Sequence, residues 1–411
     1  MTPHAHAGLI AVCSALCAVA PLAAGYLQGQ GRGGGQSITI HAARVLDGGG
    51  KVIANGVVEV RGTKIAAVDQ RTGPVTYDLG DATVLPGMID VHVHLNWTFG
   101  PDGKYGGRGV LPSFTSDAIL DNARKTLMAG FTTVQSVGWT GDKPLKDAIS
   151  AGIVNGPRIL TSLTQIQGGT RTPDELRAAV RQAKTDGADL IKFFASASIR
   201  EGGRMNVTQD QVNAVCTEAK ALGLRTLVHA HSSDSVIAAV KAGCTQIEHG
   251  MFVDDAAIKA MADAKVYFDP NIGLVLQNYL EHRDQYNGSG NFNDEGFAAM
   301  EAALPRGVDV FKKALAAGIK MPMGTDAVAG AHGQNAREII TRVQQGGQAP
   351  MDAIIGATSL AAESMNLGDQ IGSLKTGYEA DIVAVTGDPV KDITRLRDVT
   401  FVMKAGRVLK K

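Results

Sequence analysis

The 411-residue chain is poor in cysteine and has no excess of charge of either sign. Two of its four cysteines, Cys13 and Cys17, lie in the N-terminal apolar segment. We read the other two, Cys216 and Cys244, as ordinary buried thiols, so no disulfide framework is expected. Lysine plus arginine and aspartate plus glutamate both number 40. This balance excludes the basic surface that a nucleic-acid partner requires.

An uncharged apolar segment, Gly8–Leu27, stands near the start of the chain. Its many small residues, with Ala18-Val19-Ala20 as one cleavage site, are typical of a signal peptide over residues 1–27, which predicts a secreted or periplasmic protein. The same segment is long enough to anchor the chain in a bilayer, the one case in which a membrane is an expected partner. A mis-assigned start or a disordered tail is the third interpretation. A glycine-rich linker follows over residues 28–36.

A hydrophobic run that begins at Val84 ends in His92-Val93-His94. In a strand, residues i and i+2 project from the same face, so the two imidazoles would lie side by side. Neutral imidazole is a common ligand of zinc and similar ions. The motif by itself also fits a solvated strand edge, so the rest of the chain must decide.

Further strand-like runs contain residues of related chemistry. They contribute Lys192 in Leu190–Phe194, His229 and His231 in Thr226–His231, His249 in Thr245–Gly250, and Asp326 in Met321–Asp326. Helix-like segments separate these runs, which predicts an α/β chain with parallel strands. In a (β/α)8 barrel the carboxyl ends of the strands meet at one mouth, so we expect these side chains to converge there.

The ordered set of His-x-His, Lys, His, His and Asp resembles the amidohydrolase superfamily over nearly the whole chain after about residue 37. Further motifs resemble the branch of bacterial Xaa-dipeptidases and imidazolonepropionase-related proteins. These are Leu85–His94, His229-Ala230-His231, Ile247–Gly250, Gly324–Ala327 and Gly377–Val383. The resemblance implies a (β/α)8 barrel of the TIM type over residues 84–365. It also implies a small β-sandwich that residues 37–83 and 366–411 build together.

The resemblance implies a centre of two divalent metal ions, with zinc the expected metal. Burial of Lys192 in an apolar strand favours the neutral amine. The resemblance implies that this amine becomes a carbamate, a carboxylated lysine, that bridges the two ions. A lysine that extends to the barrel mouth is the alternative.

The same resemblance implies the remaining metal ligands. The first ion would take His92, His94 and Asp326. The second would take His249 and one histidine of the fifth strand. We place His229 in that role and His231 in contact with substrate, and the reverse assignment stays open. Glu248, next to His249, is expected to face away from the mouth and to be structural.

Two such ions would acidify a bridging water. Asp326 would take the proton and return it to the leaving amine, while a metal ion or His231 polarises the scissile carbonyl. We therefore expect hydrolysis of an amide or peptide C–N bond in a small N-acyl amino acid or dipeptide-like substrate. A mononuclear cyclic-amide hydrolase or deaminase is the alternative, and Lys192 argues against it. A non-catalytic barrel scaffold would have lost ligands, and none of the expected positions is lost.

Three long loops, over residues 96–115, 162–173 and 271–305, would form walls at the mouth. The first and the third of these loops contribute Trp97 and Tyr279 as predicted apolar walls for the substrate. The other predicted substrate contacts are Arg200 and Arg204 after the fourth strand, as carboxylate-binding cations, and His332 after the eighth strand. Gly168-Gly169-Thr170 stands where relatives carry Gly-Gly-His, which removes one polar group from substrate selection. The sequence leaves the oligomeric state open, and a homo-oligomer is compatible with it.

Overall fold

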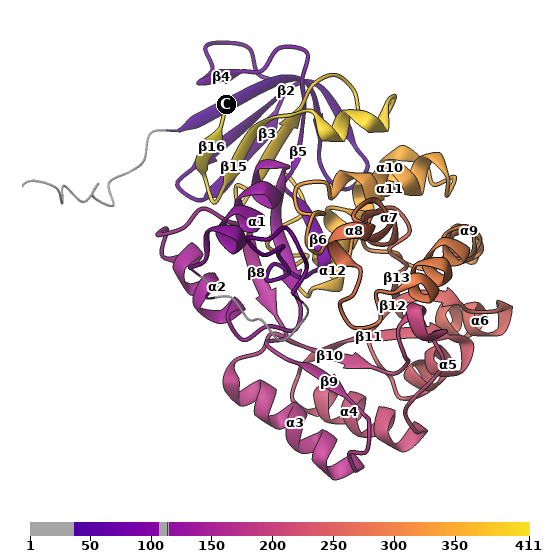
Figure 1. Cartoon of the computed structure of the whole chain (residues 1–411). Helices are drawn as coiled ribbons and strands as arrows, with labels where there is room; N and C mark the ends of the chain where they lie inside the picture. The colour runs from indigo at the N-terminus through magenta and orange to yellow at the C-terminus, as the bar shows by residue number, and fades with distance from the viewer. Residues whose placement is uncertain (1–36, 107–112, 114) are drawn as a thin grey trace, which may run out of the picture. The chain divides into compact units, whose positions relative to one another are not determined.

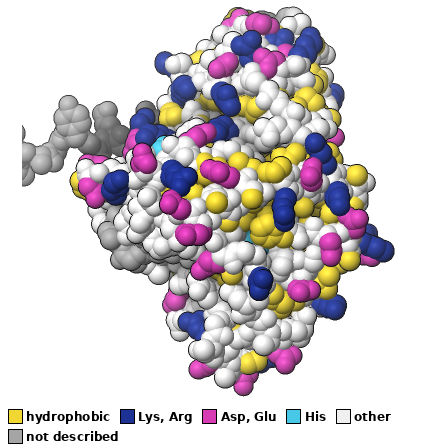
Figure 2. All heavy atoms as spheres, turned by 45° about the vertical axis from the view of Figure 1, so that its right-hand side comes forward, with side chains coloured by type: hydrophobic (Ala, Val, Ile, Leu, Met, Phe, Trp, Pro, Cys, Tyr) yellow, Lys and Arg dark blue, Asp and Glu magenta, His cyan; other side chains and the backbone are white. Residues whose placement is uncertain are grey.

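The computed structural model describes residues 37–106, 113 and 115–411. The predicted signal peptide or anchor and the glycine-rich linker lie outside these residues. Among the described residues, no helix is long and apolar enough to cross a membrane. Figure 2 shows lysine and arginine side chains interspersed with aspartate and glutamate over one face, as the equal numbers of the two charge types lead one to expect.

Strands from the two ends of the described chain form one hydrogen-bonded sheet (Figure 1). They are β1 (Ile38–Leu46), β2 (Val52–Arg61), β3 (Lys64–Asp69), β4 (Tyr77–Asp78), β5 (Thr83–Pro86), β14 (Ile382–Val385), β15 (Val399–Lys404) and β16 (Arg407–Lys410). Their order is β16-β15-β14-β5-β1-β2-β3, with β4 beside β1. The Gly62 carbonyl in the β2–β3 turn packs against Gly406 in the β15–β16 turn, so the sheet curls until its two ends meet. The predicted β unit shared by the N- and C-terminal segments is therefore present.

The barrel strands are parallel and follow one another around a ring. They are β6 (Met88–Val93), β7 (Phe131–Ser136), β8 (Arg158–Thr161), β9 (Gln165–Gln167), β10 (Leu190–Phe194), β11 (Arg225–Ser232), β12 (Gln246–Phe252) and β13 (Tyr267–Asp269). Strands β8 and β9 are successive parts of the third barrel strand: β8 pairs with β7, and β9 pairs with β10. A backbone hydrogen bond from Asp189 to Thr161 joins the two parts of the ring.

The eighth position of the ring is an irregular segment, where the sequence predicts a strand. The N–H of Phe268 donates to the Lys320 carbonyl, and the N–H of Val91 donates to the Met323 carbonyl, both at 3.0 Å. The segment thus lies between β13 and β6 and closes the barrel. It departs from regular strand geometry because Pro322 has no N–H to donate and Asp326 has a left-handed φ of 53°.

Helices follow the strands and cover the outside of the barrel (Figure 1). They are α1 (Asp117–Met128), α2 (Asp142–Ser150), α3 (Pro173–Asp186), α4 (Gln209–Ala221), α5 (Ser233–Lys241), α6 (Asp255–Ala264), α7 (Val275–Glu281), α8 (Arg283–Tyr286), α9 (Asp294–Ala316), α10 (Ala336–Gln344), α11 (Pro350–Gly356) and α12 (Ser359–Ser364). Two short 3-10 helices, η1 (Ile199–Glu201) and η2 (Ile393–Arg397), complete the set.

The helical segment that follows the barrel is split into α11 and α12, because Thr358 between them has a non-helical backbone (φ −133°, ψ −100°). The long loop expected over residues 271–305 contains α7, α8 and the first part of α9. The wall of the barrel mouth after β13 is therefore largely helical.

The prediction that Cys216 and Cys244 are free thiols is wrong, because they form a disulfide. Cys216 lies in α4, and Cys244 lies in the turn between α5 and β12. Packing of successive βα units brings their Cα atoms to 5.2 Å, within the range that a disulfide spans. A separation of 28 residues carries no local sign of this contact.

Candidate active site

Strand alternation brings the predicted metal ligands to one buried cavity of about 70 Å³. The residues that share it are His92 and His94 at the end of β6, Lys192 on β10, His229 and His231 on β11, His249 on β12, and Asp326 after the irregular segment. All are buried except Asp326, which is partly buried. The chain thus places every predicted ligand around one small space.

Distances within this cluster are those of direct contact. Lys192 Nζ lies 3.1 Å from His92 Nε2. One carboxylate oxygen of Asp326 lies 3.1 Å from His94 Nε2 and 3.4 Å from His92 Nε2. The ring centres of His92 and His249 are 5.4 Å apart. His92 on β6 is therefore the residue at which Lys192 of β10 and Asp326 of the irregular segment come together.

The two candidate histidines of β11 both face the cavity. Their ring centres are 4.6 Å apart, and they lie 4.6 Å (His229) and 5.0 Å (His231) from the ring of His249. His229 stacks on Phe194, and its Nε2 lies 3.4 Å from the carbonyl oxygen of Ala197. Both histidines are therefore within reach of a second ion beside His249.

Two residues of the cluster have a left-handed backbone, His249 with φ 73° and Asp326 with φ 53°. Such conformations cost about 1–3 kcal/mol in a non-glycine residue and concentrate at functional sites. At His249 the break in strand geometry lets two successive residues approach His92. Glu248, expected to face away from the mouth, is fully buried with Oε2 only 2.7 Å from His92 Nδ1.

Burial keeps the imidazoles of the cavity neutral. It lowers the pKa of His92 and His94 to about 4 and that of His231 to about 3. It also lowers the pKa of His229 and His249 well below the usual value. Neutral imidazole is the form that binds metal ions.

Asp326 is the ionised group of the cavity. Burial raises the pKa of this carboxyl, but its interactions with His92, His94 and Lys192 together outweigh burial and hold the pKa well below its usual range. Neutral imidazoles, one carboxylate and a lysine amine form a donor set that suits divalent transition metals. Ligand atoms of His92, His94 and Asp326 all lie within 4.8 Å of one another, so this part of the site fits a metal ion as it stands.

Asp90 is a fully buried residue beside the site that no sequence motif marked. Its carboxylate accepts hydrogen bonds from the His92 N–H, from the N–H and hydroxyl of Thr325, and from the Asn335 amide. It thereby ties the end of β6 to the segment that carries Asp326. Strand alternation could have identified Asp90, since it lies two residues before His92 and therefore on the same face of the strand.

A second buried group of charges lies beneath His92. Asp269 pairs with Arg342 at 2.9 Å, and Arg342 pairs with Glu338 at 2.9 Å. Burial raises the pKa of Glu248 to about 7 and that of Asp269 to about 8. Glu338 accepts from the backbone N–H groups of residues 272 and 273, which connects this group to the loop before α7. Only the pair of Glu338 and Arg342, four residues apart on α10, has a local sign in the sequence. The other contacts join separate elements and have none.

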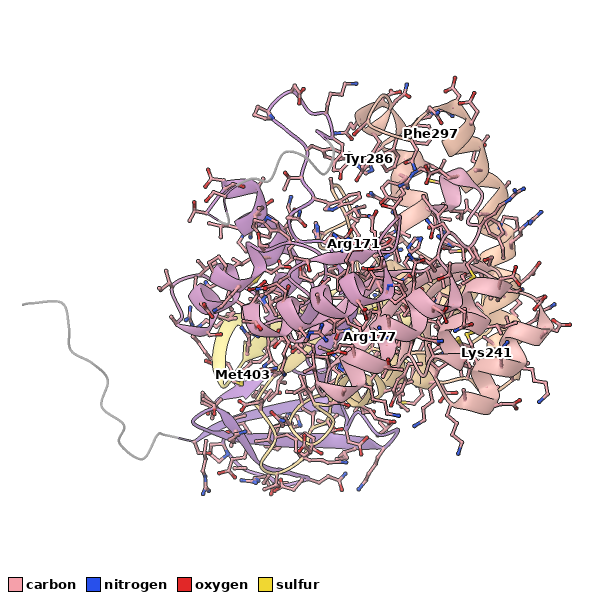
Figure 3. The ribbon with its side chains drawn as sticks, turned by 90° about the horizontal axis from the view of Figure 1, so that it is seen from below. Arg171, Arg177, Lys241, Tyr286, Phe297 and Met403 are labelled. Carbon is pink, nitrogen blue, oxygen red and sulfur yellow. A yellow bond between two sulfur atoms is a disulfide. The ribbon has the colours of Figure 1, made fainter. Side chains whose placement is uncertain are left out.

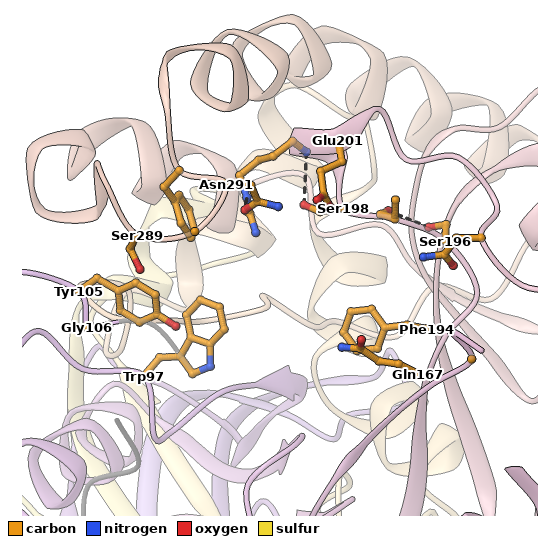
Figure 4. A pocket seen from close by; sticks show the side chains of 17 residues that line it. Trp97, Tyr105, Gly106, Gln167, Phe194, Ser196, Ser198, Glu201, Ser289 and Asn291 are labelled. Atoms are coloured by element: carbon orange, nitrogen blue, oxygen red, sulfur yellow. Dashed lines mark hydrogen bonds between the residues drawn. The ribbon is translucent and has the colours of Figure 1, made fainter. Parts of the chain in front are cut away.

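A larger pocket of about 610 Å³ adjoins the cavity. The two share the lining residues Trp97, Phe194, Ser198 and Arg200. Figure 4 shows Trp97 and Tyr105 on one side of the pocket, Phe194 and Gln167 on the other, and Asn291 above the opening between them. Gly168 and Gly169 of the loop after the third strand also line it. The pocket has the size and the aromatic walls of a small-molecule site.

The other predicted substrate residues are placed differently from one another. Tyr279 lines the inner cavity, and Arg200 lines both spaces. Arg204 is exposed and lines neither. His332 is buried outside the cavity lining, with Nε2 3.2 Å from the carbonyl oxygen of His94, so it supports the backbone of a cavity residue.

Residues 83–409 match the amidohydrolase family. The chain belongs to this family. It is 26% identical to the ochratoxinase of Aspergillus niger over a 428-residue alignment that covers 90% of this chain and 86% of that protein. It is 23% identical to the imidazolonepropionase of Streptococcus sanguinis strain SK36, over 81% of this chain and 84% of that one. A solved Xaa-Pro dipeptidase with bound methionine superposes with a TM-score of 0.81 at 30% identity, covering 92% of this chain and 100% of that one.

These findings confirm the family resemblance, the (β/α)8 barrel with its β unit, and the reaction class. The protein is a hydrolase that acts on C–N bonds of amides and belongs to a metal-dependent family.

Proposed function

We propose that this amidohydrolase carries two metal ions and cleaves the amide bond of a small N-acyl amino acid or dipeptide-like substrate. One observation carries the proposal: the small cavity with its lysine, histidines and carboxylate adjoins a much larger aromatic pocket, and an arginine lines both. About 70 Å³ admits only the reacting group, so the rest of the substrate must lie in the pocket of about 610 Å³.

The donor set supports two ions, with zinc the expected metal. His92, His94 and Asp326 would hold one ion, and His249 with His229 or His231 would hold the other. Lys192, as a carbamate, would bind both, which its position 3.1 Å from His92 Nε2 supports. When bound, the ions would acidify water and polarise the scissile carbonyl.

Asp326 would move the proton of the reaction. The ionised carboxylate accepts a proton from water as the water oxygen adds to the carbonyl carbon. It then returns the proton to the amine nitrogen as the C–N bond breaks, which yields a carboxylic acid and an amine. His231 would donate a hydrogen bond to the carbonyl oxygen from the cavity wall, since its imidazole is neutral.

The substrate class follows from the pocket walls and from the relatives. Trp97, Tyr105 and Phe194 provide flat apolar walls for a bulky acyl group. The name Xaa-Pro dipeptidase, carried by one similar protein, supports hydrolysis of an amide that joins an acyl group to an amino acid. Arg200, which lines both spaces, favours a substrate whose amino-acid half ends in a free carboxylate, because a guanidinium group binds a carboxylate well.

Metal analysis of the purified protein, combined with a hydrolysis screen, tests this function. The screen uses N-acyl amino acids and dipeptides, including aromatic acyl groups, with zinc added. About two ions per chain with hydrolysis of an N-acyl amino acid is the expected result. About one ion, with turnover of a cyclic amide only, would assign the mononuclear alternative. A protein with no bound ion and no turnover would contradict the proposal and would favour a non-catalytic barrel that only binds its ligand.

A further inference from the structure

Arg200 is held in one position by a loop far away in the sequence. It lies on η1 after β10, and its guanidinium carbon lies 4.0 Å from the ring centre of Phe292 and 5.5 Å from that of Tyr279. Its Nε donates a hydrogen bond of 2.6 Å to Oδ1 of Asn291. Asn291 and Phe292 both belong to the loop between α8 and α9. Two loops of the barrel mouth therefore meet at this arginine.

The α8–α9 loop is itself anchored by aromatic packing. Phe292 lies 4.9 Å from Tyr286 and 6.2 Å from Phe297 between ring centres. Figure 3 shows Tyr286 and Phe297 on the same side of the molecule, away from Met403 of the small sheet. A side chain at Gly296 would collide with the backbone carbonyl of Asn291 and lie 3.4 Å from Cβ of Arg200. Glycine at this position lets the start of α9 close against both residues.

These contacts decide which donors of Arg200 a ligand can use. Asn291 occupies Nε–H, and the ring of Phe292 covers one face of the guanidinium. The two terminal nitrogens, Nη1 and Nη2, remain as a pair in the plane of the group. Among the described residues no carboxylate forms an ion pair with Arg200, although Glu201 lines the same pocket. A planar, paired donor matches the two oxygens of a carboxylate.

We propose that Asn291 is a positioning residue for substrate selection: it holds Arg200 so that the two terminal nitrogens bind the free carboxylate of the amino-acid half of the substrate. This inference rests on the proposed function, because it assumes a substrate with the free carboxylate that the arginine would bind. Specificity for the carboxylate then depends on the loops after the fourth and the seventh barrel strands together. Without Asn291, the long side chain must be ordered each time substrate binds, which weakens binding.

Binding of two analogues without the scissile carbonyl tests the inference apart from hydrolysis. The probes are N-benzylphenylalanine and its C-terminal amide, measured by calorimetry on the full, metal-loaded protein. The wild-type protein is expected to bind the acid about tenfold or more tightly than the amide, as a charged hydrogen-bonded pair provides. Asn291→Ala is expected to reduce this ratio by about three- to tenfold.

Two further variants separate positioning from a general disturbance of the loop. Asn291→Asp keeps the size and the acceptor oxygen, but its charge neutralises the guanidinium, so the acid-to-amide ratio is expected to fall to about one. Asn287→Ala is the matched control, since Asn287 is exposed on the same loop and lines neither space. The control is expected to keep the wild-type ratio.

Kinetics on N-benzoylphenylalanine gives a second reading. Loss of a contact made equally before and during reaction raises KM and leaves kcat unchanged, and this is the pattern expected for Asn291→Ala. Equal binding of the two analogues by the wild-type protein, or an unchanged ratio in Asn291→Ala, would overturn the inference. If no amide is hydrolysed but the acid is preferred and the preference depends on Asn291, the hydrolytic function fails and the carboxylate site stands.

Discussion

Lys192 is the residue whose chemistry is least expected from its surroundings. It is buried on β10, between apolar neighbours, with Nζ 3.1 Å from His92 Nε2. Burying a lysine side chain among apolar neighbours is costly, so its presence at this point calls for a function. Bridging two ions as a carbamate would supply one.

We expect Lys192→Ala to lose both the bound metal and the activity, because it removes the group that we propose the two ions share. Elemental analysis and turnover measurements check this, with Lys241→Ala, an exposed lysine on α5, as the matched control. Partial recovery of both properties with acetate or propionate would support the carbamate in particular. A variant with near-normal metal content and rate would remove the bridging role.

We expect Asp326→Asn to lower kcat by at least ~10²-fold, the lower end of what a positioned acid–base group contributes. Asparagine tolerates the left-handed backbone at this position about as well as aspartate, so the fold should survive. Steady-state kinetics at saturating substrate, with thermal unfolding as a control for the fold, checks this. Unchanged turnover would show that another group moves the proton.

At the scale of secondary-structure elements, buried carboxylates join the ends of neighbouring strands. Asp90 connects β6 to the irregular eighth segment. Asp142, in the first turn of α2, accepts hydrogen bonds from Ser136 at the end of β7 and from Thr161 at the end of β8. The mouth of the barrel is therefore held by polar bonds as well as by apolar packing.

Asp142 leads to a prediction on pH. Burial raises the pKa of this carboxyl to about 7 in the folded protein, whereas an unfolded aspartate has a pKa of about 3.9. The folded state therefore binds the Asp142 proton more tightly than the unfolded state does. The stability that this proton contributes is complete below about pH 3.9 and is lost as the pH rises through about 7. Asp142→Asn removes this titration.

Thermal unfolding between about pH 5 and pH 8 measures the effect. The wild-type melting temperature should fall more steeply with rising pH than that of Asp142→Asn. The difference between the two curves isolates this one group, since the other buried carboxyls titrate in both proteins. Parallel curves would show that Asp142 does not carry the proton in the folded state.

At the scale of the whole molecule, the disulfide between Cys216 and Cys244 bears on where the protein works. Disulfides persist in oxidising compartments and are rare in the cytosol. We propose that the chain is exported, in keeping with the apolar N-terminal segment. Recovery of the enzyme from the periplasm or the medium would support export, and its retention in the cytosol would contradict it.

The disulfide also predicts a dependence of stability on redox state. A bridge of this kind typically adds about 2–4 kcal/mol to the free energy of unfolding. Reductant should therefore lower the denaturant midpoint of the wild-type protein. The double variant Cys216→Ser with Cys244→Ser should unfold early with or without reductant. Thiols that can be titrated at Cys216 and Cys244 themselves, in the unfolded protein without reductant, would show that the bridge does not form.

The sequence by itself determined the barrel and the set of residues around its mouth. Strand alternation is a local property, so the His-x-His motifs and Lys192 could be assigned to one face each. The convergence of those faces follows from a general rule for parallel barrels. Aromatic positions in the long loops also predicted apolar walls at the mouth, and Trp97 and Tyr279 line the site.

Only the tertiary structure decided the contacts that hold and tune this site. Asp269 beneath His92, Asn291 beside Arg200 and the bridge from Cys216 join elements far apart in the chain. The left-handed backbone at His249 brings its ring beside that of His92, although Glu248, the residue before it, contacts His92 as well. The physical reason is common to all of these: their energy comes from the packing of separate βα units, and no local pattern of residues records which side chains that packing brings together.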